Sequence, residues 1–338
     1  MRCSSPFVVL VAIAASGCGS DTPLSLATNH DSARAEQLGG SVYLIGGSSD
    51  GVSEVAPILA SSELGAFNRA GATLTSGFGG FASFVAGERL WLLGGADQTG
   101  YLATVKSAEL TNGVLASFAD STLTLESPRA SHGSFAISDR IYLVGGMQQN
   151  TASLSTVETA TVTAEGALGD FARVVDVNLT TGRHSFVTAV IGNYVYVIGG
   201  DADGIDERDD VERATITSEG ALVGFEPVLG VHLNVPRAGA TALITPERLY
   251  VIGGLDSNER ALDSVEVASI TTGGELGTFQ IVNGVSLAEA RAFHAAILVG
   301  DDYYVLGGSD LLGKGEILTY ERAHLAGGVL GDFNTVVD

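Results

Sequence analysis

The sequence predicts an all-β protein, a six-bladed β-propeller, from two repeated motifs and one strand pattern. An apolar run ending in two glycines recurs six times along the 338 residues. The first glycines of these pairs lie 48 to 54 residues apart, at Gly46, Gly94, Gly145, Gly199, Gly253 and Gly307. A second motif, L-x-x-F, runs in phase with the first and ends at Phe67, Phe118, Phe171, Phe225, Phe279 and Phe333. A shared period near 50 residues indicates an array of small equivalent units.

Each unit is predicted to hold four short strands, which the sixth repeat shows best. Its β-rich runs are separated by glycine turns or polar loops and span Arg291–Val299, Tyr303–Gly308, Ile317–Leu325 and Gly331–Val337. The links are of hairpin length, which predicts an antiparallel meander.

The second strand of each unit indicates how the units pack. It is apolar at consecutive positions, as in Val195–Ile198, so both of its faces should be buried. Sheets packed face to face around an axis provide that burial. The glycine pairs should serve positive φ angles or close backbone approach. Leu26 aligns with Leu287, which predicts a chain that starts at a first strand and ends at a fourth. The ring should then close by packing of blade one on blade six without a shared strand, a loose exchange of the N-terminal stretch being the alternative.

The first residues are predicted to be a targeting segment. Arg2 precedes an apolar run, Phe7–Ala15, that is too short to span a bilayer and typical of a secretory signal. The following Ala15–Cys18 resembles a bacterial lipobox, which implies lipidation of Cys18, and Gly19 after it implies transport to the outer membrane. The alternative is a plain signal peptide with an unrelated cysteine. The predicted organisation is a signal peptide over 1–17, a tether over 18–23 and the propeller over 24–338.

Composition limits the partners. The net charge of −22 and the pI of about 4.4 exclude nucleic acid and anionic lipid surfaces, so membrane contact is expected only through the lipid anchor. Both cysteines, Cys3 and Cys18, lie in the targeting segment, so the remainder can form neither an internal disulfide nor a cysteine-ligated metal site. No cofactor is expected, and a monomer is predicted.

The repeat resembles the kelch propellers of the galactose oxidase type. The resemblance rests on the apolar-Tyr-apolar-apolar-Gly-Gly strand, the downstream aromatic, and an Arg-x-x-His motif at Arg129–His132 and Arg291–His294. It covers about residues 24–338 and implies four-stranded blades of kelch type. Trp91 departs from the pattern where other repeats have tyrosine. The copper oxidase chemistry of the family needs a Tyr–Cys crosslink, which a chain without cysteine after Cys18 cannot form.

A recurring arginine is the first candidate binding feature. Four successive repeats carry it sixteen residues before the glycine pair, and repeats one and two have other residues there: Arg129, Arg183, Arg237, Arg291, His30 and Phe78. These positions precede the innermost strand and should ring one mouth of the central channel. Four guanidiniums there suggest an anion site. The alternative is a structural arginine that bonds backbone carbonyls between blades.

The polar loops after the glycine pairs should open on the same face, where binding usually resides. In one of them, Asp201, Asp203 and Asp206 have a calcium-like spacing but lack the rest of an EF-hand loop, so a solvated acidic loop is the stronger interpretation. The recurrence of His132 and His294 at one repeat position favours a structural role.

These observations favour an exported, lipid-anchored binding or scaffold protein of the bacterial cell envelope that presents its loop face to a protein or glycan. No nucleophile elbow, P-loop or zinc motif appears, so the prediction is a non-enzymatic protein. The alternative is a mutarotase- or isomerase-like enzyme that acts on an anionic sugar at the arginine-lined channel mouth.

Overall fold

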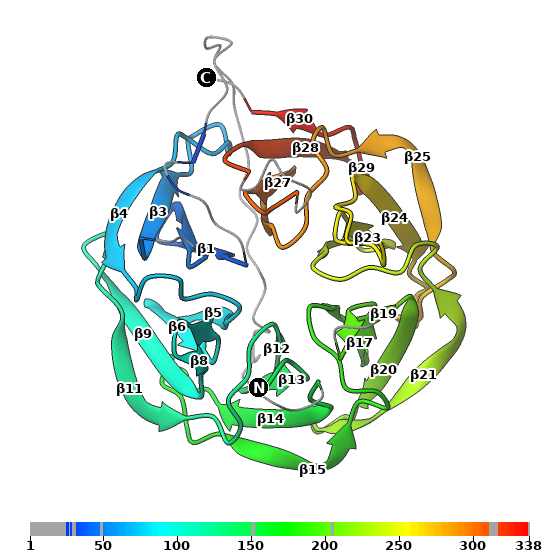
Figure 1. The fold of residues 1–338 in the computed structure, drawn as a ribbon, viewed down its shortest axis with the longest axis horizontal. Coiled ribbons are helices and arrows are strands. Elements are labelled where there is room, and N and C mark those ends of the chain that lie inside the picture. The colour runs from blue at the N-terminus through cyan, green and yellow to red at the C-terminus, as the bar shows by residue number, and fades with distance from the viewer. Residues whose placement is uncertain are drawn as a thin grey trace, which may run out of the picture.

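The computed structural model describes residues 25–26, 28, 32–47, 50–149, 153–203, 206–310 and 317–336. The predicted signal peptide, the tether and Cys18 lie outside these ranges. Within them every regular element is a β-strand, and six antiparallel sheets surround a central axis (Figure 1). No helix of the described chain is long and apolar enough to cross a bilayer. The predicted six-bladed propeller is confirmed.

The first three blades follow chain order outward from the axis. Blade one holds β1 (Arg34–Leu38), β2 (Ser41–Ile45), β3 (Val52–Pro57) and β4 (Asn68–Thr73). Blade two holds β5 (Ala82–Ala86), β6 (Arg89–Leu93), β9 (Thr104–Thr111), β10 (Val114–Leu115) and β11 (Ala119–Thr124). Blade three holds β12 (Gly133–Ile137), β13 (Arg140–Val144), β14 (Thr156–Thr161) and β15 (Ala172–Asn178).

The other three blades repeat this order. Blade four holds β16 (Val187–Ile191), β17 (Tyr194–Ile198), β20 (Asp210–Ile216) and β21 (Leu222–His232). Blade five holds β22 (Thr241–Ile244), β23 (Arg248–Ile252), β24 (Ser264–Ser269) and β25 (Gln280–Ser286). Blade six holds β26 (Ala295–Val299), β27 (Asp302–Leu306), β28 (Tyr320–Ala326), β29 (Val329–Leu330) and β30 (Asn334–Thr335). The loops between second and third strands carry two small hairpins, β7 (Ala96–Asp97) with β8 (Gly100–Tyr101) and β18 (Asp201–Ala202) with β19 (Asp206–Glu207).

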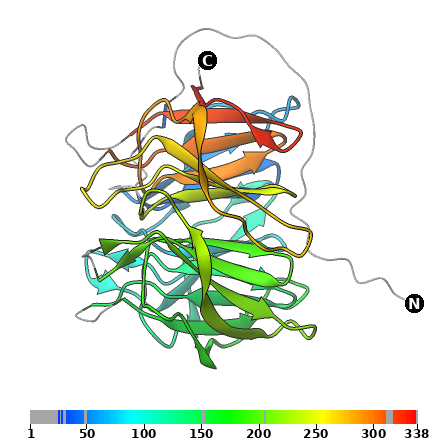
Figure 2. The ribbon, with the colours of Figure 1, turned by 90° about the vertical axis from the view of Figure 1, so that its right-hand side faces the viewer.

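Burial follows the strand pattern. The second strands are buried along nearly their whole length, as in β17, where Val195, Tyr196, Val197 and Ile198 are at most 1% exposed. Hydrophobic clusters lie between neighbouring blades, for example between blades three and four. In the side view of Figure 2 the sheets lie beside one another around the molecule. The core is therefore a ring of blade-to-blade interfaces.

The two sequence motifs meet across these interfaces. In four blades the aromatic residue of the second strand bonds the glycine turn before the fourth strand of the next blade. Tyr196 Oη donates to Gly274 O at 2.9 Å, and Trp91 Nε1 donates to Gly166 O at 3.0 Å. The series closes where Leu64 N of blade one donates to Tyr304 Oη of blade six at 3.2 Å. Trp91 therefore replaces tyrosine without loss of the interblade donor.

A second ring lies at the axis. The residue two positions before each first strand has a positive φ, and its N–H donates to the carbonyl of the equivalent residue in the preceding blade. The members are Ser32, Gly80, Ser131, Ser185, Gly239 and Phe293, with N···O distances of 2.6 to 3.1 Å. The bond from Ser32 N to Phe293 O closes the cycle. We call this set the inner ring.

The N-terminal stretch completes blade six. Leu26 N donates to Leu318 O, and Ser25 forms a bridge with Thr319 beside β28. The same bond follows the fourth strand of blade five, where Leu287 N donates to Asp263 O. The outer edge of blade six is thus formed by both ends of the chain. The prediction of closure without a shared strand was wrong, and the alternative, a loose exchange of the N-terminal stretch, is what the structure shows. Ser25 takes the place in blade six that Ser286 holds in blade five.

Candidate functional site

The four recurring arginines are buried parts of the scaffold. Arg129, Arg183, Arg237 and Arg291 are at most 1% exposed. Each donates from Nη1 to the carbonyl of the first glycine of its own blade, at 2.8 to 3.1 Å. Each donates from Nη2 to a glutamate on the third strand, at 2.5 to 2.8 Å: Glu158, Glu212, Glu266 and Glu321. These glutamates are also at most 1% exposed.

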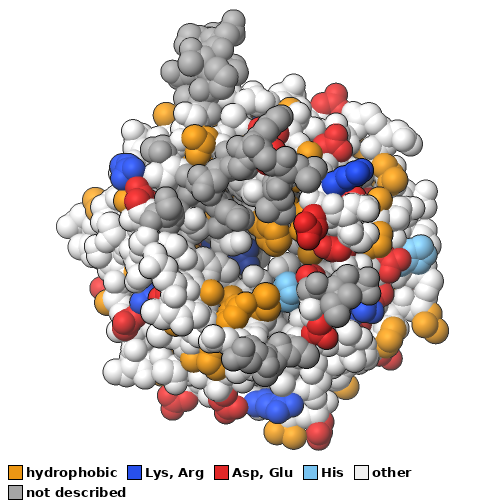
Figure 3. Space-filling view, viewed as in Figure 1, with side chains coloured by type: hydrophobic (Ala, Val, Ile, Leu, Met, Phe, Trp, Pro, Cys, Tyr) orange, Lys and Arg blue, Asp and Glu red, His pale blue; other side chains and the backbone are white. Residues whose placement is uncertain are grey.

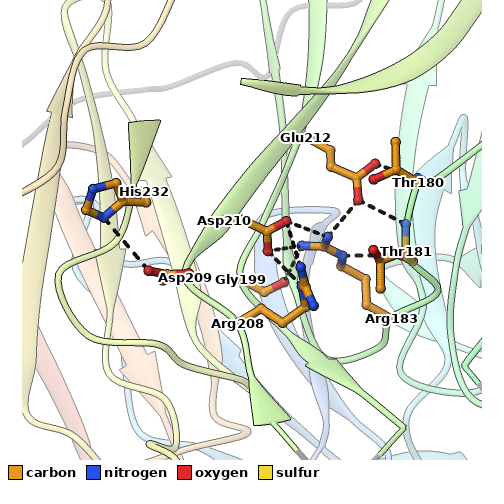
Figure 4. A network of polar contacts seen from close by, with 9 residues as sticks. All are labelled: Thr180, Thr181, Arg183, Gly199, Arg208, Asp209, Asp210, Glu212 and His232. Carbon is orange, nitrogen blue, oxygen red and sulfur yellow. Dashed lines mark hydrogen bonds and ion pairs between the residues drawn. The ribbon is translucent and has the colours of Figure 1, made fainter. Parts of the chain in front are cut away.

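Each glutamate also fixes the chain that leads into its blade. In blade four, Glu212 accepts hydrogen bonds from the N–H groups of Thr180 and Thr181 (Figure 4). Blades three, five and six repeat this contact with the equivalent residues. We call this unit of arginine, glutamate and connecting chain the Arg–Glu clip. It joins the third strand to the segment that arrives from the preceding blade.

Blade four extends its clip toward the surface. Asp210 accepts two bonds from Arg183, each of 3.0 Å, and also pairs with Arg208 at 2.7 Å (Figure 4). Burial alone raises the pKa of Asp210, but the hydrogen bonds from Arg208 and Arg183 outweigh it and bring that pKa to about 2. Asp210 is therefore a carboxylate at neutral pH.

The predicted anion site at these arginines is contradicted. Their guanidiniums are inaccessible, and glutamates already neutralise them. The alternative of a structural arginine that bonds backbone carbonyls is correct. The carbonyls, however, belong to the same blade and not to a neighbouring one. These arginines contact the preceding blade through their main chain, as where Gly200 N donates to Arg237 O at 2.9 Å.

Blade two departs from the clip, and blade one differs at the arginine position. Glu54 of blade one is buried and accepts from Thr28 N at 2.9 Å, as the clip glutamates do. His30 lies outside the described residues, and Phe78 is 1% exposed and stacked on Phe81 at 4.8 Å, so Phe78 is core rather than channel lining. The glutamate position of blade two holds Lys106, whose Nζ lies 5.7 Å from the Phe78 ring centre and 2.5 Å from Asp120. An apolar ring and a lysine thus replace the arginine and glutamate together.

A small chamber of about 60 Å³ lies on the axis beside the inner ring. Its lining includes inner-ring residues and the side chains Arg34, His132, Phe186, Thr241 and His294. Figure 3 shows a hollow at the centre of one face with basic surface inside it. Arg34 is the basic residue of the lining. Alignment of the repeats does not reveal it, because arginine occurs at this position in one blade only.

The two chamber histidines differ in their partners. His294 Nε2 lies 2.8 Å from Thr241 Oγ1 of blade five. The position of Thr241 is held by Ala82 in blade two, next to His132, and neither ring nitrogen of His132 has a hydrogen-bond partner. Burial lowers the pKa of His132 well below its usual value, and Arg129 and Arg34 lower it further. Burial lowers the pKa of His294 to about 3. Both imidazoles are neutral at pH 7.

The loops after the glycine pairs open beside the inner ring, as predicted. In five blades the residue after the arginine position bridges the residue after the glycine pair, as in His184 with Asp201. Neighbouring loops also contact one another. Ser153 N donates to Asp203 Oδ1 at 2.7 Å, and Asp203 N donates to Ser153 Oγ at 3.1 Å. We call this set of six loops the loop face.

The candidate calcium ligands serve other contacts where they are described. Asp203 holds Ser153, and Asp201 Oδ2 lies 3.7 Å from His184 Nε2. The side chain of Asp206 lies outside the described atoms. Among the described side chains no three His, Cys, Asp or Glu residues gather as metal ligands.

Comparison with known proteins supports the fold assignment. A family model described as the Kelch motif matches residues 236–267, which span Arg237 and the glycine pair of blade five. The solved structure titled "Structure of YjhT" is 12% identical, with a TM-score of 0.68 over 94% of this chain and 99% of that one. At this identity the likeness shows the fold alone. No curated protein sequence matches the chain. The protein is a six-bladed propeller in which residues 236–267 match the Kelch motif.

Proposed function

We propose that this protein is a non-enzymatic binding or scaffold protein whose loop face engages a protein or glycan partner. The observation that carries the proposal is the contrast between the loop face and its support. The inner ring of main-chain hydrogen bonds is closed, and four buried Arg–Glu clips fix the chain within their blades. Aromatic residues of the second strands add further bonds between neighbouring blades. The loops after the glycine pairs differ in sequence, and where they are described they begin beside the inner ring on one face. Variable loops on a rigid scaffold are a common form of binding surface.

The blade-five loop shows what such a surface offers. Asp256 Oδ1 accepts from Asn258 N at 2.9 Å and from Arg260 N at 3.0 Å, which shapes the turn from within. Ser257, Asn258 and Arg260 are then exposed on a fixed backbone. A preorganised loop loses little conformational entropy on binding.

The binding experiment compares two faces of one molecule. Soluble protein from residue 20 onward is presented to envelope extracts and to a glycan array. One loop variant is S257A/N258A/R260A in blade five, and the other is Gln98→Ala in the opposite blade two. The control is S218A/E219A in the turn before the fourth strand of blade four, which is exposed on the other face. We expect at least one loop variant to lose the partner while the control keeps it. Equal binding by all variants contradicts the proposal.

We further propose that the protein is exported and anchored at the bacterial outer membrane through Cys18. The apolar run and the Ala15–Cys18 sequence support this. Acyl-chain incorporation and membrane fractionation of wild type and Cys18→Ser test it. Incorporation that persists in Cys18→Ser, or fails in wild type, contradicts the anchor.

A further inference from the structure

The chamber at the axis holds an unusual combination of groups. Arg34 is half-buried, and within the described chain no hydrogen bond or ion pair joins its guanidinium to another group. His132 is 2% exposed, and both of its ring nitrogens lack partners. Buried polar groups are almost always hydrogen-bonded, and a cation removed from water needs a counter-charge. The chamber therefore has donors that the described part of the protein leaves unused.

The carboxyl of Glu36, on the same strand, interacts electrostatically with Arg34 but forms no ion pair with it. Glu36 lies two residues along β1 from Arg34, and its Oε1 accepts instead from Ser83 Oγ of blade two at 2.6 Å. Burial raises the pKa of Glu36, against the opposing effects of Ser83 and Arg34. Burial likewise lowers the pKa of Arg34, opposed by Glu36. Within the described chain, Arg34 is thus a partly buried cation that interacts electrostatically with Glu36 but forms no ion pair with it.

The inner ring limits which groups can contact a ligand. Its N–H and C=O groups are used in bonds between blades. Contacts inside the chamber must therefore come from side chains. The polar ones are Arg34, His132, the serines of the ring, and the pair of Thr241 and His294, which contact each other. Phe186 forms an apolar wall. A guanidinium fork beside a neutral imidazole and a hydroxyl presents several hydrogen-bond donors to one point.

We propose that the chamber binds a small oxyanion, with Arg34 as its main ligand and His132 and Ser131 as further donors. The volume of about 60 Å³ is enough for formate, acetate or a single inorganic oxyanion. The site is distinct from the buried clips, where each arginine already has a glutamate. None of the loop residues chosen for substitution lines the chamber, so separate variants test the partner on the loop face and the anion on the axis.

The test is a set of melting curves at matched ionic strength with sodium formate, acetate, sulfate, phosphate, chloride and citrate. Wild type should show a saturable rise in melting temperature with one class of small oxyanion, and formate against sulfate separates planar from tetrahedral ligands. A saturable rise of equal size with citrate would show that the site does not select small oxyanions and would contradict the proposal. Ligand binding to the native state alone raises stability by mass action.

Two variants of Arg34 and one control variant test whether Arg34 is the main ligand of the anion. Arg34→Gln should lose the saturable rise, and Arg34→Lys, which keeps the charge but not the fork, should need a higher concentration for the same rise. Arg140→Gln removes an exposed arginine on β13 and should respond like wild type. If Arg34→Gln does not fold, Arg34→Lys and a calorimetric titration of wild type carry the test. No saturable rise and no heat of binding in wild type, or an unchanged response in the Arg34 variants, overturns the proposal.

Discussion

At the clip arginines, one buried guanidinium neutralises one buried carboxylate and bonds the carbonyl of the first glycine in its blade. Such a pair adds little net stability when it is intact, since both charges lose their hydration. Removal of one partner is costly because it leaves the other charge buried. This asymmetry explains why blade two differs at both positions together, with Phe78 and Lys106.

Arg237→Ala should therefore destabilise the protein by about 3–5 kcal/mol, because Glu266 is left buried without its cation. The double variant R237M/E266M should lose much less than the single one, since no unpaired charge remains. Urea unfolding of the three proteins measures both values. A double variant that is as unstable as the sum of two single losses would show that the pair itself, and not its separation, provides the stability.

The chamber histidines predict acid sensitivity. The pKa of His294 is about 3 in the folded state, against about 6.5 for an unfolded histidine. Between these pH values the unfolded state binds a proton and the folded state does not. Stability should fall as pH drops below about 6.5 and continue to fall toward pH 3, by up to about 1.4 kcal/mol per pH unit from this group. His294→Gln, which retains an amide near Thr241, should flatten the profile of unfolding free energy between pH 6.5 and 4. An unchanged slope would contradict the buried neutral form.

At the scale of elements, the glycine pairs show what repetition predicts well. Gly253 has a φ of +63°, and a Cβ on it would lie 2.7 Å from Arg291 O of the next blade. Both proposed reasons for the pair, positive φ and close approach, therefore apply to one residue. The position of the glycine pair within the repeat was enough to predict both properties, because each blade packs against an equivalent blade.

Gly253→Ala should destabilise the protein by more than Gly284→Ala. Gly284 has a φ of +82°, and a Cβ added there would have no atom within 4 Å, so its substitution costs only backbone strain, about 1–2 kcal/mol. The excess for Gly253 measures the contact between blades. Equal losses in thermal unfolding would mean that the interface yields to the extra methyl group.

Residues that differ from the repeat could not be predicted as site residues from the sequence. Arg34 is an arginine at a position where the other blades have different residues, and His132 lacks a partner because Ala82 stands in place of threonine. Alignment of the repeats shows what the blades share, so it does not reveal such single differences. The prediction of an anion site at the four arginines was wrong for a different reason. The positions of these arginines were predicted correctly, but the direction of their side chains depends on the glutamates of the third strand, which the repeat alignment did not link to them.

At the scale of the whole molecule, the closure of the ring joins both chain ends in blade six. Leu26 is 2% exposed and packs in the cluster between blades one and six. Leu26→Ala should cost about 2–5 kcal/mol, similar to Leu287→Ala at the equivalent position inside blade five. Urea unfolding compares the two. A small loss for Leu26→Ala alone would show that the N-terminal stretch is a peripheral tail.

The strongly acidic surface and the rigid loop face together define what the molecule offers a partner. With a net charge of −22, attraction over distance should favour partners with basic or neutral surfaces, and rim charges should affect association rates more than affinity.

The most direct test of the proposed function is the dissociation constant for one captured partner, measured for S257A/N258A/R260A, Gln98→Ala and S218A/E219A at a temperature where all three remain folded. The loop face predicts a loss of at least tenfold, about 1.4 kcal/mol, for one of the first two variants and no change for the third. A loss confined to S218A/E219A would place the binding surface on the opposite face and contradict the account.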